Sequence, residues 1–303
     1  MAQTVTNELR QWIIEQARSG CSAESVLQAM KDAGWDEDVA LDALELTLRQ
    51  HLGVGAEAGD AAQLSQATQL AAVAERVSAS GRPARRALPE PSLSGSPRQV
   101  DAGDRMVDVL VSLSSPRLVV FGNLLSPEEC DALVAAARPR LSRSLTVQTD
   151  TGGEEMNADR TSQGMFFRRG ELDVVSRVEA RLARLLNWPV ENGEGLQVLR
   201  YQPGAEYKPH YDYFDPSEAG TAHIVKRGGQ RLATIVMYLN EPRLGGGTTF
   251  PDIGLEVAPQ RGHAVFFSYD RPHPATRTLH GGAPVIEGEK WVATKWLRER
   301  EFS

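Results

Sequence analysis

The sequence predicts a mainly β domain, a sandwich or jelly roll buttressed by helices, behind a small N-terminal domain of three helices. In the larger part, short apolar runs are divided by Gly, Pro and Asp, at 196–201, 233–239, 264–269 and 291–296. Many short strands separated by turns are typical of such β folds. In the first 51 residues, apolar residues recur instead at helical spacing. A chain of 303 residues is long enough for both domains.

The N-terminal domain spans 1–51 and is predicted to contain three short helices. Gly20 ends the first helix, and Ser22 caps the second. Gly34 breaks the chain again, and Asp36 caps the third helix. The first helix carries an apolar stripe formed by Leu9, Trp12, Ile13 and Ala17. A unit of about 45 residues folds alone only marginally, so we expect it to pack against something else.

This small domain loosely resembles a ubiquitin-associated module. The likeness rests on Met30, on the Gly34-Trp35 turn and on the trailing helix rich in Ala and Leu. The resemblance implies that the N-terminal helices dock a partner. A purely structural cap is the alternative.

Residues 52–104 form a predicted linker. Its first half, rich in Ala and Gln, is able to form a helix at 61–79. Its second half contains four prolines, which remove backbone donors and fix φ: Pro83, Pro89, Pro91 and Pro97. The main domain is therefore expected to run from 105 to 303.

Two helices are predicted inside the main domain. The first opens at Ser126, with Pro127 at the first helical position and Glu129 three residues after the cap. The second spans 171–186. We expect both helices to buttress the strands that follow them.

Bulk composition excludes several classes of protein. The net charge of −7 argues against phosphate-driven binding of nucleic acid. No apolar run reaches the roughly 18 residues that span a bilayer, and the first residues lack the regions of a signal peptide. The cysteines, Cys21 and Cys130, lie in unrelated segments, so no disulfide is expected. We therefore expect a cytoplasmic protein that binds neither nucleic acid nor membrane.

The first chemical motif is His210-Tyr211-Asp212. On a strand, side chains at i and i+2 face the same side, so His210 and Asp212 can converge on one ion. Two histidines with one carboxylate leave coordination positions open, as in non-haem iron sites. So short a pattern also arises by chance, and an exposed pair at a strand end is the alternative.

A second motif contains His280 and Lys290. His280 can supply the third ligand from a distant strand. Lys290 follows a turn at Glu287-Gly288, and a hairpin would bring its ammonium group back beside the metal strand. There it can pair with the distal carboxylate of a 2-oxo diacid. Two alternatives stand: Lys290 as a solvent-facing lysine, and His273 as a competing ligand, although its flanking prolines place it in a loop.

These segments together resemble the prolyl 4-hydroxylase family of 2-oxoglutarate dioxygenases. The resemblance covers most of 105–303, and the motifs stand in family order. They are Arg200-Tyr201-Gln202-Pro203-Gly204, His210-Tyr211-Asp212, Gly229-Gln230-Arg231-Leu232-Ala233-Thr234, Gly245-Gly246-Gly247-Thr248-Thr249-Phe250-Pro251, and the segment from His280 to Trp296.

The resemblance implies a double-stranded β-helix that holds Fe(II). Such an enzyme consumes O2 and 2-oxoglutarate, releases succinate and carbon dioxide, and hydroxylates an unactivated C–H bond, with ascorbate (vitamin C) as reductant. The positions carried over are the catalytic iron ligands His210, Asp212 and His280; the 2-oxoglutarate-binding residues Lys290, Tyr201 and Thr248; and the substrate-binding residues Tyr207, Arg231 and Trp296.

The sequence thus predicts an Fe(II)- and 2-oxoglutarate-dependent dioxygenase that hydroxylates a prolyl residue in a protein or peptide. The same chemistry on another side chain or on a small molecule is a second hypothesis. A non-catalytic binding module is a third. The complete His-Asp-His-Lys set argues against the third, because such a module has no physical need of it.

Overall fold

The computed structural model describes residues 5–19, 21–35, 39–41, 43–44, 46–48, 87–143, 146–147, 154–155 and 161–303. Contacts divide the chain into two compact units, 1–86 and 87–303. The predicted helix at 61–79 lies outside the described residues, as do Gly20 and Asp36. Within the described part of the chain, no helix is long and apolar enough to cross a bilayer.

The first unit contains α1 (Asn7–Arg18) and α2 (Ala23–Asp32). Ser22 caps α2 as predicted, because its hydroxyl accepts a hydrogen bond from the backbone N–H of Ser25. Helical residues follow at 39–41, 43–44 and 46–48, where the third helix was expected. One apolar cluster joins these segments, formed by Ile13, Val26, Met30, Ala40, Ala43, Leu44 and Leu48.

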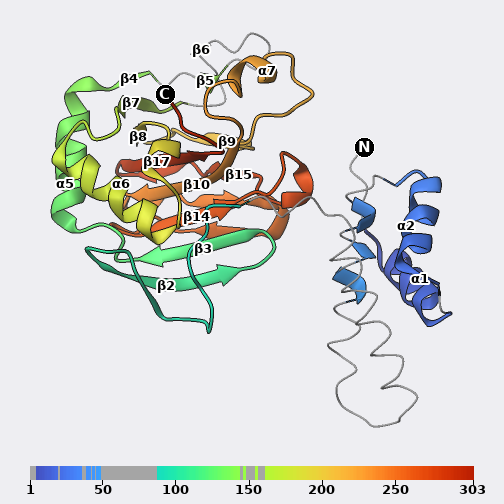
Figure 1. Cartoon of the computed structure of the whole chain (residues 1–303). Coiled ribbons are helices and arrows are strands. Elements are labelled where there is room, and N and C mark those ends of the chain that lie inside the picture. The colour runs from blue at the N-terminus through green and yellow to red at the C-terminus, as the bar shows by residue number, and fades with distance from the viewer. Residues whose placement is uncertain are drawn as a thin grey trace. The chain divides into compact units, whose positions relative to one another are not determined.

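The second unit is built on a large sheet of nine strands, all of them paired antiparallel. In spatial order the strands are β1 (Gln99–Asp101), β2 (Met106–Leu113), β3 (Arg117–Gly122), β14 (Ala264–Ser268), β10 (Arg231–Tyr238), β17 (Lys290–Arg298), β8 (Leu196–Tyr201), β7 (Gln163–Phe167) and β4 (Ser142–Arg143). Figure 1 shows how these strands run side by side.

A smaller antiparallel sheet of four strands completes the sandwich. Its order is β13 (Leu255–Val257), β12 (Thr248–Phe250), β15 (His280–Gly282) and β9 (Tyr207–His210). Two short ribbons accompany it: β11 (Leu244–Gly245) with β16 (Val285–Glu287), and β5 (Thr146–Val147) with β6 (Glu154–Glu155). The mainly β prediction is confirmed, and the antiparallel sheets are consistent with a jelly roll.

Helices cover the outer face of the large sheet (Figure 1). They are α5 (Pro127–Ala137) and α6 (Asp173–Leu185), and a single turn, α7 (Thr221–Ile224), lies further along the chain. The predicted capping box of α5 is present, since Ser126 and Glu129 satisfy each other's backbone N–H groups. Short 3₁₀ turns are η1 (Arg138–Arg140), η2 (Val190–Asn192), η3 (Pro251–Ile253) and η4 (Pro274–Thr276).

Two apolar clusters fix the three layers. The first lies between the helices and the large sheet, with Leu133, Val178 and Phe266 among its buried members. The second lies between the two sheets and includes Phe250 and Phe267. Burial of each such side chain contributes about 1.5–3 kcal/mol, so the spacing of the sheets is firmly set.

The boundary between the units differs from the expected one at residue 104. Residues 87–104 belong with the second unit. β1 pairs with β2, and Asp104 accepts hydrogen bonds of 2.9 and 2.6 Å from the buried guanidinium of Arg181. The prolines of this segment suggested a linker, but an extended chain can also pack along a sheet edge without donating to it.

Candidate active site

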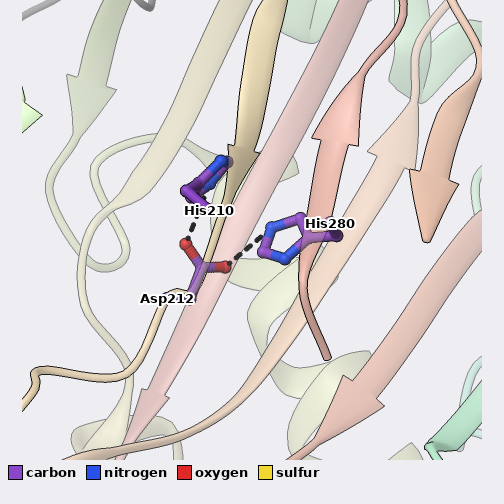
Figure 2. A group of neighbouring side chains, drawn as sticks. All are labelled: His210, Asp212 and His280. Atoms are coloured by element: carbon purple, nitrogen blue, oxygen red, sulfur yellow. Dashed lines mark ion pairs between the residues drawn. The ribbon is translucent and has the colours of Figure 1, made fainter. Parts of the chain in front are cut away.

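The pairing of β9 with β15 places His210 directly opposite His280. Asp212 follows two residues after His210, just beyond the end of β9. Its carboxylate lies between the two rings, with Oδ1 3.5 Å from His210 Nε2 and Oδ2 3.3 Å from His280 Nε2 (Figure 2). One ligand atom from each residue lies within 4.8 Å of the others. The predicted trio therefore converges on one point.

Backbone carbonyls set the orientation of both imidazole rings. His210 Nδ1 lies 2.9 Å from the carbonyl oxygen of Lys208, and His280 Nδ1 lies 3.0 Å from that of Thr278. Because a carbonyl only accepts, each Nδ1 must carry the hydrogen, which leaves the lone pair on Nε2. Both Nε2 lone pairs then lie on the side of Asp212, where a metal ion could be shared. A backbone carbonyl that accepts from the other ring nitrogen is typical of metal-binding histidines.

The charge state of the trio suits a divalent metal. Burial, followed by the charge of His280, lowers the pKa of His210, so its ring is neutral and free to coordinate. Burial of Asp212 opposes ionisation, but the charges and hydrogen bonds of His280 and His210 hold the pKa of Asp212 well below its usual range. Two imidazoles and one carboxylate form the donor set of a non-haem Fe(II) site with open positions.

Lys290 reaches the same cavity from the opposite sheet. It opens β17, pairs with Tyr201 of β8, and is 3% exposed. Its ammonium lies 5.5 Å from the ring centroid of Tyr201 and 5.8 Å from that of Tyr238. No ion pair with a carboxylate is formed among the described residues, and burial lowers the pKa of Lys290 to about 8. The charge of Glu256 only partly opposes this effect of burial. A buried cation without an ion-pair partner of its own among the described residues is suited to an anionic ligand.

The predicted hairpin between the metal strand and Lys290 is wrong. β16 pairs with β11, and after the turn at Gly288 β17 crosses into the large sheet between β10 and β8. Lys290 therefore starts from the opposite sheet, and its ammonium reaches across the sandwich to lie close to Gly282 of β15, the strand that carries His280. The sequence contains no signal for this change of sheet.

Hydroxyl groups gather around Lys290. The hydroxyl of Tyr238 donates a 2.8 Å hydrogen bond to that of Thr248, and Tyr201 and Thr248 both line the cavity. Tyr238 was not predicted from the sequence. It lies two residues after Val236 and four after Thr234 on β10, so the three side chains face the same side of the strand. That period of two was the available signal.

The residues predicted to contact substrate fall into two groups. Tyr207 stacks on the ring of His210 with centroids 3.8 Å apart, and Trp296 lines the cavity. Arg231 instead donates to the buried carboxylate of Glu194 at 2.7 and 2.9 Å and to the backbone carbonyl of Asp212 at 3.3 Å. Its guanidinium also lies 4.1 Å from the ring centroid of Trp296. Glu194 was not predicted from the sequence.

One cavity collects eight of the nine predicted site residues, all except Arg231. Its lining residues are Leu199, Tyr201, Tyr207, His210, Asp212, Val236, Thr248, His280, Gly281, Gly282, Lys290, Val292, Thr294 and Trp296. His273, the alternative third ligand, is outside it. Its Nδ1 accepts a 3.0 Å hydrogen bond from the backbone N–H of Ala275 and so caps η4.

Comparison with known proteins agrees with this geometry. Residues 196–298 match the 2OG-Fe(II) oxygenase superfamily. Prolyl 4-hydroxylase 5 of Arabidopsis thaliana is 42% identical over 221 residues, which cover 66% of this chain and 74% of that protein. The chain belongs to the prolyl 4-hydroxylase family. It is an enzyme, an Fe(II)- and 2-oxoglutarate-dependent dioxygenase.

Other prolyl 4-hydroxylases match over the same region. Prolyl 4-hydroxylase 1 of Arabidopsis thaliana is 44% identical over 207 residues, covering 62% of this chain and 71% of that protein. A solved structure of viral collagen prolyl hydroxylase from Paramecium bursaria Chlorella virus-1, in complex with 2-oxoglutarate, is 32% identical. It covers 60% of this chain and 95% of that one, with a TM-score of 0.46.

Proposed function

We propose that this enzyme hydroxylates a prolyl residue in a protein or peptide. The observation that carries the proposal is the joint placement of the His210–Asp212–His280 trio and the buried Lys290 in one cavity. The names of the relatives, prolyl 4-hydroxylases, support the choice of proline.

In this proposal His210, Asp212 and His280 hold Fe(II). When bound, the metal supplies the activation of O2 that is coupled to decarboxylation of 2-oxoglutarate. The ammonium of Lys290 binds the distal carboxylate of 2-oxoglutarate through a charge-assisted contact, and Tyr201 and Thr248 line the same end of the cavity. Leu199, Val236 and Val292 are the apolar residues of the wall, and they limit the entry of water.

The substrate side is formed by aromatic groups. A prolyl ring is apolar and compact, and the faces of Tyr207 and Trp296 offer it a matching surface. Arg231 supports this wall from behind, because it stacks on Trp296 while Glu194 fixes its guanidinium. We assign Arg231 to positioning in addition to its predicted substrate role.

Two further parts of the proposal concern the reductant and the location of the enzyme in the cell. Ascorbate is proposed as the reductant that keeps the iron ferrous, and a cytoplasmic location stays a prediction from the sequence. Omission of ascorbate should shorten the period of linear product formation. An unchanged time course at limiting enzyme would exclude a role for it.

The substrate class is tested by mass spectrometry. Proline-containing peptides are incubated with enzyme, Fe(II) and 2-oxoglutarate under ¹⁸O2, and one labelled oxygen atom is expected on proline. Matched peptides with alanine in place of proline should stay unmodified. Label on another side chain, or succinate release driven only by a small molecule, would replace the prolyl assignment with the second hypothesis.

A fragment of residues 87–303 is expected to keep iron binding and slow, substrate-free succinate release, since all site residues lie within that unit. A fragment of residues 105–303 loses β1 and the Asp104 partner of Arg181. The 105–303 fragment should therefore unfold at a temperature several degrees below that of the 87–303 fragment. Thermal unfolding and succinate release of both fragments check this. Equal stability would contradict the assignment of 87–104 to the catalytic unit.

We further propose that the N-terminal helices dock the protein target. The 87–303 fragment should then modify short peptides as the full chain does, but modify an intact target more slowly. A fragment that is equally fast on intact targets would leave the helices a structural role only.

Affinity for 2-oxoglutarate is expected to fall above pH 8. Burial lowers the pKa of Lys290 to about 8, and only the protonated form pairs with a carboxylate. Binding is therefore strongest below pH 8 and weakens about tenfold for each unit above it. The KM for 2-oxoglutarate at pH 7 to 9.5 measures this. Lys290→Arg is the control, because its guanidinium stays charged and its pH profile should be flat.

A further inference from the structure

A buried chain of hydrogen bonds ends on Asp212. The hydroxyl of Thr234 lies 2.7 Å from Asp212 Oδ2, and the hydroxyl of Tyr269 lies 3.1 Å from Thr234 Oγ1. Thr234 is on β10 and is 0% exposed; Tyr269 follows β14 and is 1% exposed. The chain thus runs from the large sheet to a residue beside the small one.

The number of hydroxyl protons determines which group donates in each of these hydrogen bonds. An ionised carboxylate only accepts, so the single hydroxyl proton of Thr234 must point to Asp212. Thr234 Oγ1 is then an acceptor, and the proton between the two hydroxyls belongs to Tyr269. A phenol has an ordinary pKa of about 10, so Tyr269 carries this proton at neutral pH. The order of donation is Tyr269 to Thr234 to Asp212.

The side chain of Asp212 needs such support because the residue lies outside the β-strands. It lies beyond the last residue of β9, so no strand pairing fixes it as the β9–β15 pairing fixes His210 and His280. Two contacts replace the pairing. Arg231 donates to the Asp212 backbone carbonyl at 3.3 Å, and Thr234 donates to the side chain. Both donors come from β10.

We propose that Thr234 and Tyr269 are positioning residues that fix the rotation of the Asp212 carboxylate for the metal. Thr234 donates to Oδ2 and so holds the carboxylate in one rotation about its Cβ–Cγ bond, with one oxygen toward Nε2 of His210 and the other toward Nε2 of His280. The inference rests on the metal site of the proposed function.

The central test is an anaerobic titration of the full chain with Co(II), in which the visible absorption of bound Co(II) reports the metal affinity. Thr234→Val keeps the shape of the side chain and removes the hydroxyl. Loss of a partner that orients a metal ligand typically weakens metal binding about 10- to 100-fold, and we expect a loss in this range. Thr234→Ser restores the donor and should recover most of the affinity.

Ser268→Ala is the matched control. Ser268 is 1% exposed, next to Tyr269 in the chain, and its hydroxyl has no hydrogen-bond partner among the described residues. Its removal deletes a buried hydroxyl of the same sheet without touching the chain to Asp212. Co(II) affinity should stay as in the wild type. A loss equal to that of Thr234→Val would mean that any disturbance of this core weakens the site, and would overturn the proposal.

Tyr269→Phe provides a second, independent variant. It removes a neutral hydrogen bond to Thr234, so a loss in metal affinity of about 2- to 10-fold is expected. If Tyr269 acts through Thr234, the same change should add nothing in the Thr234→Val background. Fully additive losses would show that Tyr269 acts by another route.

The outcomes separate this inference from the metal site itself. If wild-type protein binds Co(II) no better than His210→Ala, the proposed metal site fails. If wild-type protein binds Co(II) at one site and Thr234→Val binds it equally well, only the positioning role fails.

Discussion

Asp212→Ala and His280→Ala are expected to abolish succinate formation. Each change leaves two ligands, and Asp212→Ala also removes the only anionic ligand of the trio. Loss of an orienting partner alone costs up to about 100-fold in affinity or activity, so loss of a ligand should exceed that. Succinate release and anaerobic metal titration measure the two effects.

His273→Ala is the matched control for His280→Ala. The sequence offered His273 as an alternative to His280 for the third metal ligand, but its ring caps η4 and lies outside the metal cluster. Its removal should leave succinate release within about twofold, because an exposed cap contributes little beyond local stability. If His273→Ala inactivates the enzyme while His280→Ala does not, the metal assignment is wrong.

Lys290→Ala is expected to raise the KM for 2-oxoglutarate by about 10- to 100-fold. The lost contact joins a buried cation to a carboxylate, and hydrogen bonds to charged groups contribute about 1.5–3 kcal/mol. Metal affinity should be unchanged, since Lys290 lies on the large sheet and two of the ligands lie on the small one.

Lys226→Ala serves as the control for Lys290→Ala. Lys226 is an exposed lysine that does not line the cavity, and its removal should leave the KM within twofold. An unaltered KM in Lys290→Ala would place the anchor for 2-oxoglutarate at another cation. A parallel loss of metal binding would point to a collapsed cavity instead.

Local patterns were enough to predict four of the nine strands of the large sheet, β8, β10, β14 and β17. The apolar runs at 196–201 and 264–269 coincide with β8 and β14 to within one residue. The capping box at Ser126 also has a local cause, because its partners lie three residues apart. Such features depend on neighbours in the chain, which the sequence displays.

Features that join distant segments were the ones missed. Thr234, Tyr269 and Glu194 come from separate parts of the chain, and only the strand order of the large sheet brings them near Asp212 and Arg231. The crossing of β17 into that sheet is of the same kind. The metal trio was found because its members occur in recognisable motifs, and its supporting residues do not.

The division of the site between two sheets has a thermodynamic consequence. The histidines lie on the small sheet, and Lys290 lies on the large one. A metal ion and a dicarboxylate bound together therefore act as a non-covalent cross-link across the sandwich. Ligands that bind only the folded state stabilise it by about 2.7 kcal/mol at a hundred times their Kd. The supply of iron and 2-oxoglutarate should thus raise the free energy of unfolding as well as support turnover.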